Sequence, residues 1–363
     1  MNARRVITAS IWGLNDMEKL KQFLTLMSFV GAFFAGVFLA IKCKKPQGMT
    51  NIGAIATETT RMLCRTPAMR DGGLVQYGRR ESFKPSKWKA PKGYSLKKLN
   101  VGGTLPAELL VDSKSEHKNK VIYQLHGGAF LMKFNDCYRG VAVKLSKLSG
   151  GASVFSIDYR IAPEYKHPAA LEDAIAGWEW LLEHGYKPED IILFGDSAGA
   201  NLSIALTEKL LEQGRPTANS IVCMSPWCDL AGEGEAFSYN IYNDPMFGRK
   251  KGALTGSYID NPEFILSYVG DSDPHDKFLS PVHCDFKDFP PMLIQVGTYE
   301  VLESDAITIF EKMKRCGNSV ILTRYPGMFH MFQMIGDIIP EAKKSWAEIG
   351  GFLRRQYNDT LFQ

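Results

Sequence analysis

The chain has 363 residues, of which 45% are hydrophobic and 23% are charged. A chain of this length and balance buries one large hydrophobic core or two smaller ones, so disordered and fibrous proteins are excluded. The formal net charge of +4 is small for the length, and the composition therefore gives no support for a nucleic-acid partner.

The N-terminal region departs from the composition of a soluble protein. Residues 23–41, FLTLMSFVGAFFAGVFLAI, carry no charge, and as a helix they would extend about 28 Å, close to the thickness of a hydrocarbon core. Lysines flank the stretch, and no small-x-small motif follows it, which argues against a cleaved signal peptide. We therefore expect an N-terminal segment, 1–48, with a single-pass membrane anchor at 23–41 whose orientation is not readable. The alternative is a buried helix of a cytoplasmic protein.

The cysteines give no indication of a cross-linked or metal-bound scaffold. Seven are present, they are scattered, and none is spaced as Cys-x-x-Cys. Neither a disulfide framework nor a zinc site is predicted, and we expect no metal and no cofactor.

Beyond about residue 90, short apolar stretches alternate with helical ones. YSLKKLNVGG (94–103) and LPAELLVD (105–112) meet at a Gly-Gly turn and predict an antiparallel hairpin. Further strands are predicted at 121–125, 152–157, 191–194, 220–224, 291–296 and 319–325. Helices are predicted between most of these strands, among them 168–185, 202–214 and 305–317, each ending in Gly. This alternation predicts a mainly parallel, doubly wound sheet.

A candidate nucleophile follows the strand at 191–194. Gly195-Asp196-Ser197-Ala198-Gly199 runs directly into a predicted helix, which is the strand-turn-helix context of a Gly-x-Ser-x-Gly elbow. Glycine is needed on both sides because the turn strains the serine backbone and brings strand and helix together. We expect the Ser197 hydroxyl to lie above the carboxyl edge of the sheet, where the chemistry of such folds collects.

A serine hydroxyl is a weak nucleophile at neutral pH and needs a base that is oriented by an acid. Where such an elbow carries the serine, the chain order is serine, acid, histidine. His330, in YPGMFHMF after the last strand, meets this demand. For the acid we prefer Glu300, which follows the strand at 291–296 closely, to Asp305. Asp305 opens a predicted helix, where capping or the helix dipole explains a carboxylate.

His-Gly-Gly at 126–128 follows the strand at 121–125. Acyl transfer needs backbone N–H donors directed at the developing oxyanion, from an upstream loop and from the residue after the nucleophile. Gly127, Gly128 and Ala198 are the predicted donors. His126 is expected to orient this loop and not to carry a proton.

Four motifs occur in one order: HGGAF (126–130), DYRIAPEYKHPAALEDA (158–174), GDSAGAN (195–201) and GMFH (327–330). Together they resemble the hormone-sensitive-lipase-like branch of the α/β-hydrolases over residues 95 to 355. The resemblance implies an α/β-hydrolase fold with a helical cap, acting on short or medium acyl esters. It also implies the roles given above to Ser197, His330 and the oxyanion loop.

Two departures from the family pattern are visible. The family commonly has HGGG where this chain has Ala129, and Asp-Pro-Leu where this chain has Glu300-Val301-Leu302. Ala129 leaves two loop amides free, and glutamate lengthens the acid by one methylene. Neither change removes the predicted mechanism.

The domain organisation follows from these assignments. Residues 49–92 are interpreted as a cap or linker region, and 93–363 as the catalytic domain with a cap insertion at about 229–268. The insertion is either a mobile lid over an acyl pocket or an ordinary packed subdomain. Trp227, Phe329 and Met331 are adjacent to the chemistry and are candidates for lining the pocket, although each could equally belong to the core.

The favoured function is a serine carboxylesterase that forms an acyl-Ser197 intermediate on a small-molecule ester. The alternative within enzymes is a deacetylase of an acetylated sugar or amide. A non-catalytic small-molecule receptor is a further alternative, and the retained His330 argues against it. The physiological substrate and the oligomeric state are not readable from the sequence.

Overall fold

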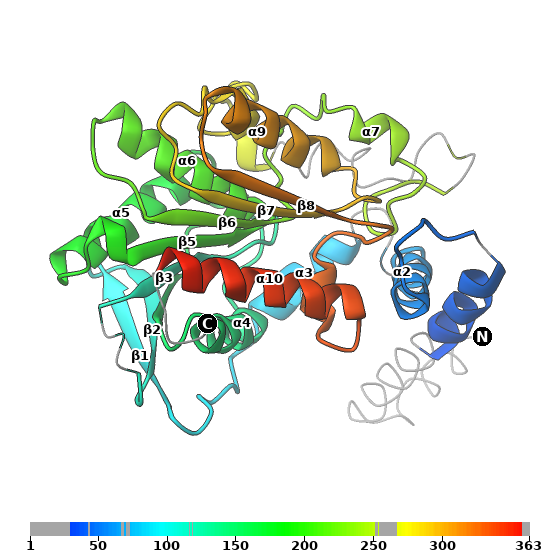
Figure 1. The fold of residues 1–363 in the computed structure, drawn as a ribbon, viewed down its shortest axis with the longest axis horizontal. Helices are drawn as coiled ribbons and strands as arrows, with labels where there is room; N and C mark the ends of the chain where they lie inside the picture. The colour runs from blue at the N-terminus through cyan, green and yellow to red at the C-terminus, as the bar shows by residue number, and fades with distance from the viewer. Residues whose placement is uncertain are drawn as a thin grey trace, which may run out of the picture.

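The structure, a computed structural model, describes residues 30–42, 44–66, 69, 73–115, 117, 119–250, 253 and 267–357. An eight-stranded sheet with the order β1-β2-β4-β3-β5-β6-β7-β8 forms its centre (Figure 1). Its strands are β1 (Tyr94–Val101), β2 (Leu105–Asp112), β3 (Val121–Leu125), β4 (Ser153–Ile157), β5 (Ile191–Asp196), β6 (Ser220–Met224), β7 (Met292–Gly297) and β8 (Val320–Tyr325).

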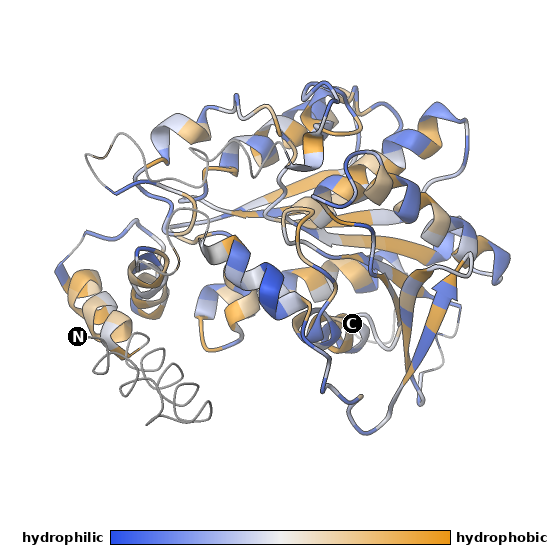
Figure 2. Ribbon diagram, turned by 180° about the vertical axis from the view of Figure 1, so that it is seen from behind, coloured by the Kyte–Doolittle hydropathy of each residue, from blue (hydrophilic) through white to orange (hydrophobic). Residues whose placement is uncertain are grey.

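The pairing confirms the predicted architecture. β1 pairs antiparallel with β2, and β2 pairs antiparallel with β4. The other neighbouring pairs in the sheet are parallel. Strands β3 to β7 are buried at every residue, because a parallel sheet is covered on both faces. This burial explains their uninterrupted apolar sequences and their hydrophobic colour in Figure 2.

Helices cover both faces of the sheet. On one face lie α5 (Ala169–Glu183), α6 (Ala198–Glu212) and α9 (Glu303–Arg315), and on the other α4 (Asp136–Leu148) and α10 (Pro340–Gln356) (Figure 1). Each face has its own apolar cluster. Shorter helices in the described residues include η1 (Pro188–Asp190), α7 (Ala236–Tyr239), η3 (Pro281–His283) and η4 (Phe332–Ile335).

The prediction of a membrane anchor at residues 23–41 is wrong. In the part of the chain that the structure describes, no helix is long and apolar enough to cross a membrane. Residues 23–29 lie outside the described residues, and the described residues 30–42 are helical. That helix lies beside α2 (Asn51–Cys64), where a Cβ added to Gly36 would be 2.3 Å from Thr59 Oγ1. The two helices therefore approach closely at Gly36, while Phe33, Phe34, Phe38 and Ile41 of the same helix remain exposed.

Two helices of the region interpreted as cap or linker contact later parts of the chain. The Thr50 N–H and hydroxyl, at the start of α2, donate to Glu341 of α10 at 2.6 and 3.0 Å. In α3 (Gly73–Ser82), Arg79 donates to the carbonyl of Leu131 at 2.8 Å and to Glu164 at 2.6 and 2.7 Å. These bonds fix both helices on the side of the molecule that carries the predicted site.

Candidate active site

Ser197 occupies a strained turn between β5 and α6. Its φ of 51° and ψ of −119° lie outside the regions that side chains favour. A Cβ on Gly195 would be 2.2 Å from the Gly199 carbonyl oxygen, and one on Gly199 would be 2.0 Å from the Leu125 carbonyl oxygen. Both positions therefore require glycine, as the motif predicts. The strain presents the serine at the carboxyl edge of the sheet.

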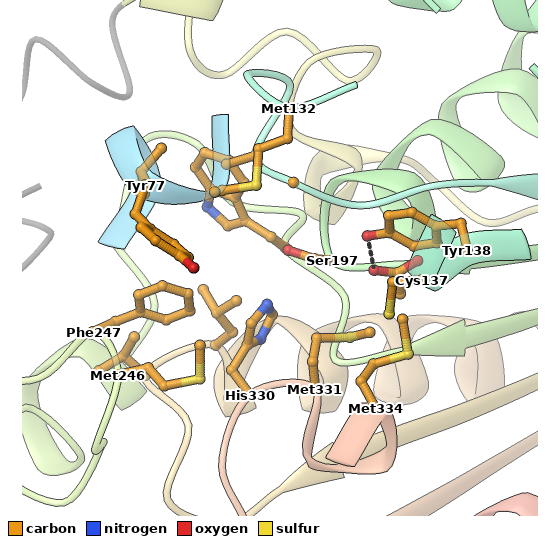
Figure 3. Close-up of a pocket in the computed structure, with 18 of the residues that line it drawn as sticks. Tyr77, Met132, Cys137, Tyr138, Ser197, Met246, Phe247, His330, Met331 and Met334 are labelled. Atoms are coloured by element: carbon orange, nitrogen blue, oxygen red, sulfur yellow. Dashed lines mark hydrogen bonds between the residues drawn. The ribbon is translucent and has the colours of Figure 1, made fainter. Parts of the chain in front are cut away.

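His330 and Glu300 form a buried pair. The distance from His330 Nδ1 to Glu300 Oε2 is 2.8 Å, and both side chains are almost fully excluded from solvent. Ser197 and His330 line the same cavity, and the imidazole is directed toward Ser197 (Figure 3). A bond from Nδ1 to a carboxylate leaves Nε2 to serve as a base. The structure thus brings together the three residues that were predicted to form the triad.

The second carboxylate oxygen of Glu300 also has fixed donors. Its Oε1 accepts the N–H of Gly297 at 2.6 Å and the hydroxyl of Ser225 at 2.8 Å. Ser225 is fully buried, and its Oγ accepts the N–H of Met331 at 3.3 Å. Ser225 was not among the predicted site residues. Its position directly after β6, at the same edge as Ser197 and Glu300, was the available signal.

Asp305, the alternative acid, has a different role. It lies in the first turn of α9, whose N-terminal residue Leu302 makes no side-chain cap. Asp305 Oδ2 accepts the N–H groups of Cys228 and Asp229 at 2.7 and 2.9 Å. The sequence attributed Asp305 to capping or to the helix dipole; its place in the first turn of α9 agrees with the dipole, and its carboxylate also binds the chain that leaves β6. Burial raises the pKa of Asp305 well above its usual value.

The loop after β3 differs in one detail from the predicted oxyanion hole. The Gly127 N–H donates to Asp196 Oδ1 at 3.1 Å, and it is therefore not free for a substrate oxygen. In the described part of the chain, the N–H groups of Gly128, Ala129 and Ala198 have no hydrogen-bond partner. Gly128 and Ala129 have φ values of 106° and 57°, which turns the chain sharply at this point.

Two buried side chains support this loop. His126 Nδ1 lies 2.8 Å from the Gly127 carbonyl oxygen, and its ring stacks on Tyr159 at 4.1 Å. Burial lowers the pKa of His126. Asp196, which also accepts the Tyr138 hydroxyl at 3.0 Å, has its pKa raised to about 7 by burial. Both groups contact the loop backbone and neither is part of the Ser197–His330–Glu300 arrangement.

An apolar cavity of about 340 Å³ lies over Ser197 and His330 (Figure 3). Trp227 and Met331 line it, as expected. Phe329 does not, because its side chain packs in an apolar cluster with Met328 and Phe332. Other lining side chains were not predicted; they include Tyr77 of α3 and Met132, Cys137, Met246, Phe247 and Met334. Within the described residues, no group of His, Cys, Asp and Glu side chains is arranged to hold a metal ion.

Comparison with known proteins agrees with this geometry. The family profile for the α/β-hydrolase fold matches residues 122–334, and the chain belongs to this family. An acetyl-hydrolase from Streptomyces hygroscopicus is 34% identical over 242 residues, which cover 67% of this chain and 78% of that protein. An esterase from Acinetobacter venetianus is 33% identical over 258 residues, covering 71% of this chain and 81% of that protein.

Solved structures give the same assignment. The crystal structure of an esterase/lipase from an uncultured bacterium has a TM-score of 0.70 and 27% identity, covering 90% of this chain and 99% of its own. An esterase from the bacterial hormone-sensitive lipase family has a TM-score of 0.67 and 27% identity, covering 91% of this chain and 98% of its own. The resemblance to the hormone-sensitive-lipase-like branch is confirmed, as is the expected enzyme class of carboxylic ester hydrolase.

Proposed function

We propose that the protein is a serine carboxylesterase that hydrolyses short- to medium-chain acyl esters through an acyl-Ser197 intermediate. The observation that carries this proposal is the Glu300–His330 pair beside Ser197 at the floor of an apolar cavity. A nucleophile, a base and an orienting acid in this arrangement are the minimum for acyl transfer by serine.

In the first half of the reaction, Ser197 Oγ attacks the ester carbonyl carbon while His330 Nε2 takes the hydroxyl proton. The carbonyl oxygen becomes an oxyanion, and the N–H groups of Gly128, Ala129 and Ala198 are the donors we propose for it. Ala129 replaces Gly127 in the expected set, because the Gly127 N–H is bound to Asp196. The bond to the alcohol then breaks, and His330 protonates the leaving oxygen.

In the second half, a water molecule attacks the acyl-Ser197 carbonyl while His330 accepts one of its protons. The bond between the carbonyl carbon and Ser197 Oγ breaks, and the proton returns to the serine. A carboxylic acid leaves and the enzyme is regenerated. Throughout, the Glu300 side chain orients His330 and stabilises the imidazolium that forms twice in each cycle.

The cavity lining favours an apolar ester over an acetylated sugar. Thioether and aromatic side chains dominate its wall, among them Met132, Met246 and Phe247. Sugar hydroxyls would lose hydrogen bonds to water in such a wall without replacement, whereas an acyl chain gains from the burial. The acetyl-hydrolase relative keeps deacetylation as the second candidate.

Hydrolysis of p-nitrophenyl esters with two to twelve acyl carbons tests the proposal. We expect turnover with a maximum at short or medium chains, an initial burst of p-nitrophenol equal to the enzyme concentration where deacylation is slow, and labelling of Ser197 by a phosphonate. Turnover of acetylated sugars with none of the p-nitrophenyl esters would favour the deacetylase. Binding of esters without turnover would favour the receptor.

A further inference from the structure

The segment from Asn240 to Gly248, which follows α7, lies between α2 and the loop that carries the catalytic acid. Arg61 of α2 donates to the carbonyl oxygens of Tyr242 and Asn243 at 3.4 and 2.7 Å. From the other side, the Asn240 amide donates to the carbonyl of Glu300 at 2.8 Å. The segment is therefore held from both sides, which is the behaviour of a packed wall and not of a detached lid.

Asp244 is the centre of this segment. It is 1% exposed, and its Oδ1 accepts the N–H groups of Met246 and Phe247 at 2.8 and 2.9 Å. Its Oδ2 accepts the N–H of Val301, the residue after Glu300, at 2.9 Å. One buried carboxylate thus joins the turn that precedes Phe247 to the acid loop. Hydrogen bonds to a charged acceptor are among the stronger ones in proteins.

The backbone that follows Phe247 in this turn is also closely packed. A Cβ added to Gly248 would be 2.4 Å from the Ile241 carbonyl oxygen and 2.5 Å from the Asp244 carbonyl oxygen. The backbone is therefore folded tightly on itself immediately after Phe247. Both neighbours of Phe247 in the turn are fixed, one through Asp244 and the other by close packing.

In this fixed position, Phe247 lies next to His330 at the candidate active site. The centres of its ring and of the His330 ring are 4.9 Å apart, at an interplanar angle of 57°. It lines the cavity, and Figure 3 shows it beside His330 with Tyr77 and Met246. An aromatic ring at this distance sets how much room an ester has next to the base.

We propose that Phe247 is a specificity-determining residue for the ester and that Asp244 is the positioning residue that holds it against His330. The inference rests on the proposed esterase function. It predicts that the size of the accepted ester depends on the Asp244 carboxylate, although this group does not touch the substrate. The reason is that Asp244 binds both the turn that carries Phe247 and the loop that carries Glu300.

Removing either residue should widen the cavity in the same place. We compare Phe247→Ala and Asp244→Asn by the ratio of kcat/KM for p-nitrophenyl octanoate to that for p-nitrophenyl acetate. Each variant is expected to raise this ratio about tenfold, since a change of pocket size by a few methylene groups has effects of this order. In Asp244→Asn the amide oxygen can still accept the N–H groups of Met246 and Phe247, but the amide nitrogen meets the Val301 N–H donor to donor, so the link between the turn and the acid loop is lost.

The double variant Asp244→Asn/Phe247→Ala gives a readout that a general loss of stability would not. If Asp244 acts through Phe247, the double variant has the same ratio as Phe247→Ala, and the two effects do not multiply. Tyr242→Ala is the matched control, because this half-exposed aromatic belongs to the same segment and does not line the cavity. It should keep the wild-type ratio.

Wild-type selectivity in Asp244→Asn, or multiplying effects in the double variant, would overturn the positioning role. An unchanged ratio in Phe247→Ala would overturn the specificity role. If Asp244→Asn does not fold, Asp244→Ser keeps a short acceptor for the turn but cannot reach Val301, and it should show the same rise. Ser197→Ala in the same assay distinguishes failure of this inference from failure of the proposed esterase function. Only residual turnover in Ser197→Ala would contradict the proposed function itself.

Discussion

The Ser225 hydroxyl donates to Glu300 Oε1 at 2.8 Å, and the same oxygen of Ser225 accepts the N–H of Met331, the residue after His330. One buried hydroxyl therefore joins the strand end after β6, the acid and the histidine loop. Glu300 is fully buried, and a polar side chain in that position needs hydrogen-bond donors to replace those it loses from water. Ser225 and the Gly297 N–H supply them.

Ser225→Ala should lower kcat about tenfold with little change in KM, because the acid loses one of its donors while the cavity is unchanged. Steady-state kinetics with p-nitrophenyl acetate measure both constants. Ser238→Ala, in the short helix α7, is a suitable control. A change in KM alone would show that Ser225 affects substrate binding and not the acid.

Ser197→Ala should reduce ester hydrolysis about 10⁴-fold or more, since no other group can form the acyl intermediate. Ser197 lines the cavity, and the substitution removes a single oxygen atom there, so the thermal midpoint should stay close to that of the wild type. Calorimetry and the chromogenic assay on the same preparation test both statements. Turnover above a tenth of the wild-type value would disprove the assignment of the nucleophile.

Glu300→Gln should lower turnover by roughly 10²- to 10⁴-fold, by analogy with the loss of the orienting acid in a serine triad. Asp305→Asn provides the matched comparison. Asp305 is a buried carboxylate of the same region, but its oxygens bind the backbone of Cys228 and Asp229 and not His330. We expect this variant to retain activity within about threefold. The reverse order of the two activities would assign the acid to Asp305.

Asp196→Asn should change how stability depends on pH. Burial raises the pKa of Asp196 from 3.8 to about 7, so the folded state favours the protonated carboxyl. A group with a raised folded pKa stabilises the protein fully below its unfolded pKa, and the contribution is lost as pH rises from about 4 through about 7. The variant lacks this loss. We therefore expect the thermal midpoint of the variant, relative to that of the wild type, to be higher at pH 8 than at pH 4. An equal difference at the two pH values would contradict the prediction.

Gly127→Ala should lower both the thermal midpoint and kcat. Its Cβ would lie 2.2 Å from Asp196 Oδ2, so either the loop or the buried carboxylate has to move. Gly140→Ala is the control, because Gly140 lies within α4 and a Cβ there meets nothing within 4 Å. That variant should be more stable by about 0.5–1 kcal/mol, as expected for alanine replacing glycine in a helix. Equal effects of the two substitutions would argue against a special requirement at Gly127.

The parts of the fold that were predictable are those with a local signal. Strands β3 to β7 are buried on both faces and therefore appear in the sequence as continuous apolar runs. Ser197 was recognisable because the glycines on both sides of it mark a tight turn in which a larger residue would collide with the neighbouring backbone. His330 and Glu300 followed from chain order, once the serine was placed.

Contacts between distant segments left no such signal. The bond from Asp196 to the Gly127 N–H spans 69 residues, and nothing in either motif distinguishes a free amide from a bound one. Phe329 and Met331 are equally apolar, but the backbone turns left-handed at Met331, with φ of 57°, so that one enters the core and the other the cavity. The apolar stretch at 23–41 has the composition of a membrane span, and nothing in that composition indicates that Gly36 lies against Thr59 of α2.

The position of α2 determines where an expression fragment can start. The family profile matches only from residue 122, yet Thr57 of α2 donates to the Gly327 carbonyl, three residues before His330, at 3.0 Å. At the N-terminal end of α2, the Thr50 N–H donates a hydrogen bond to Glu341. A fragment trimmed to the residues of the profile would leave the histidine loop without its outer support. The smallest practical fragment for crystallisation or screening therefore begins ahead of Met49 and extends through α10.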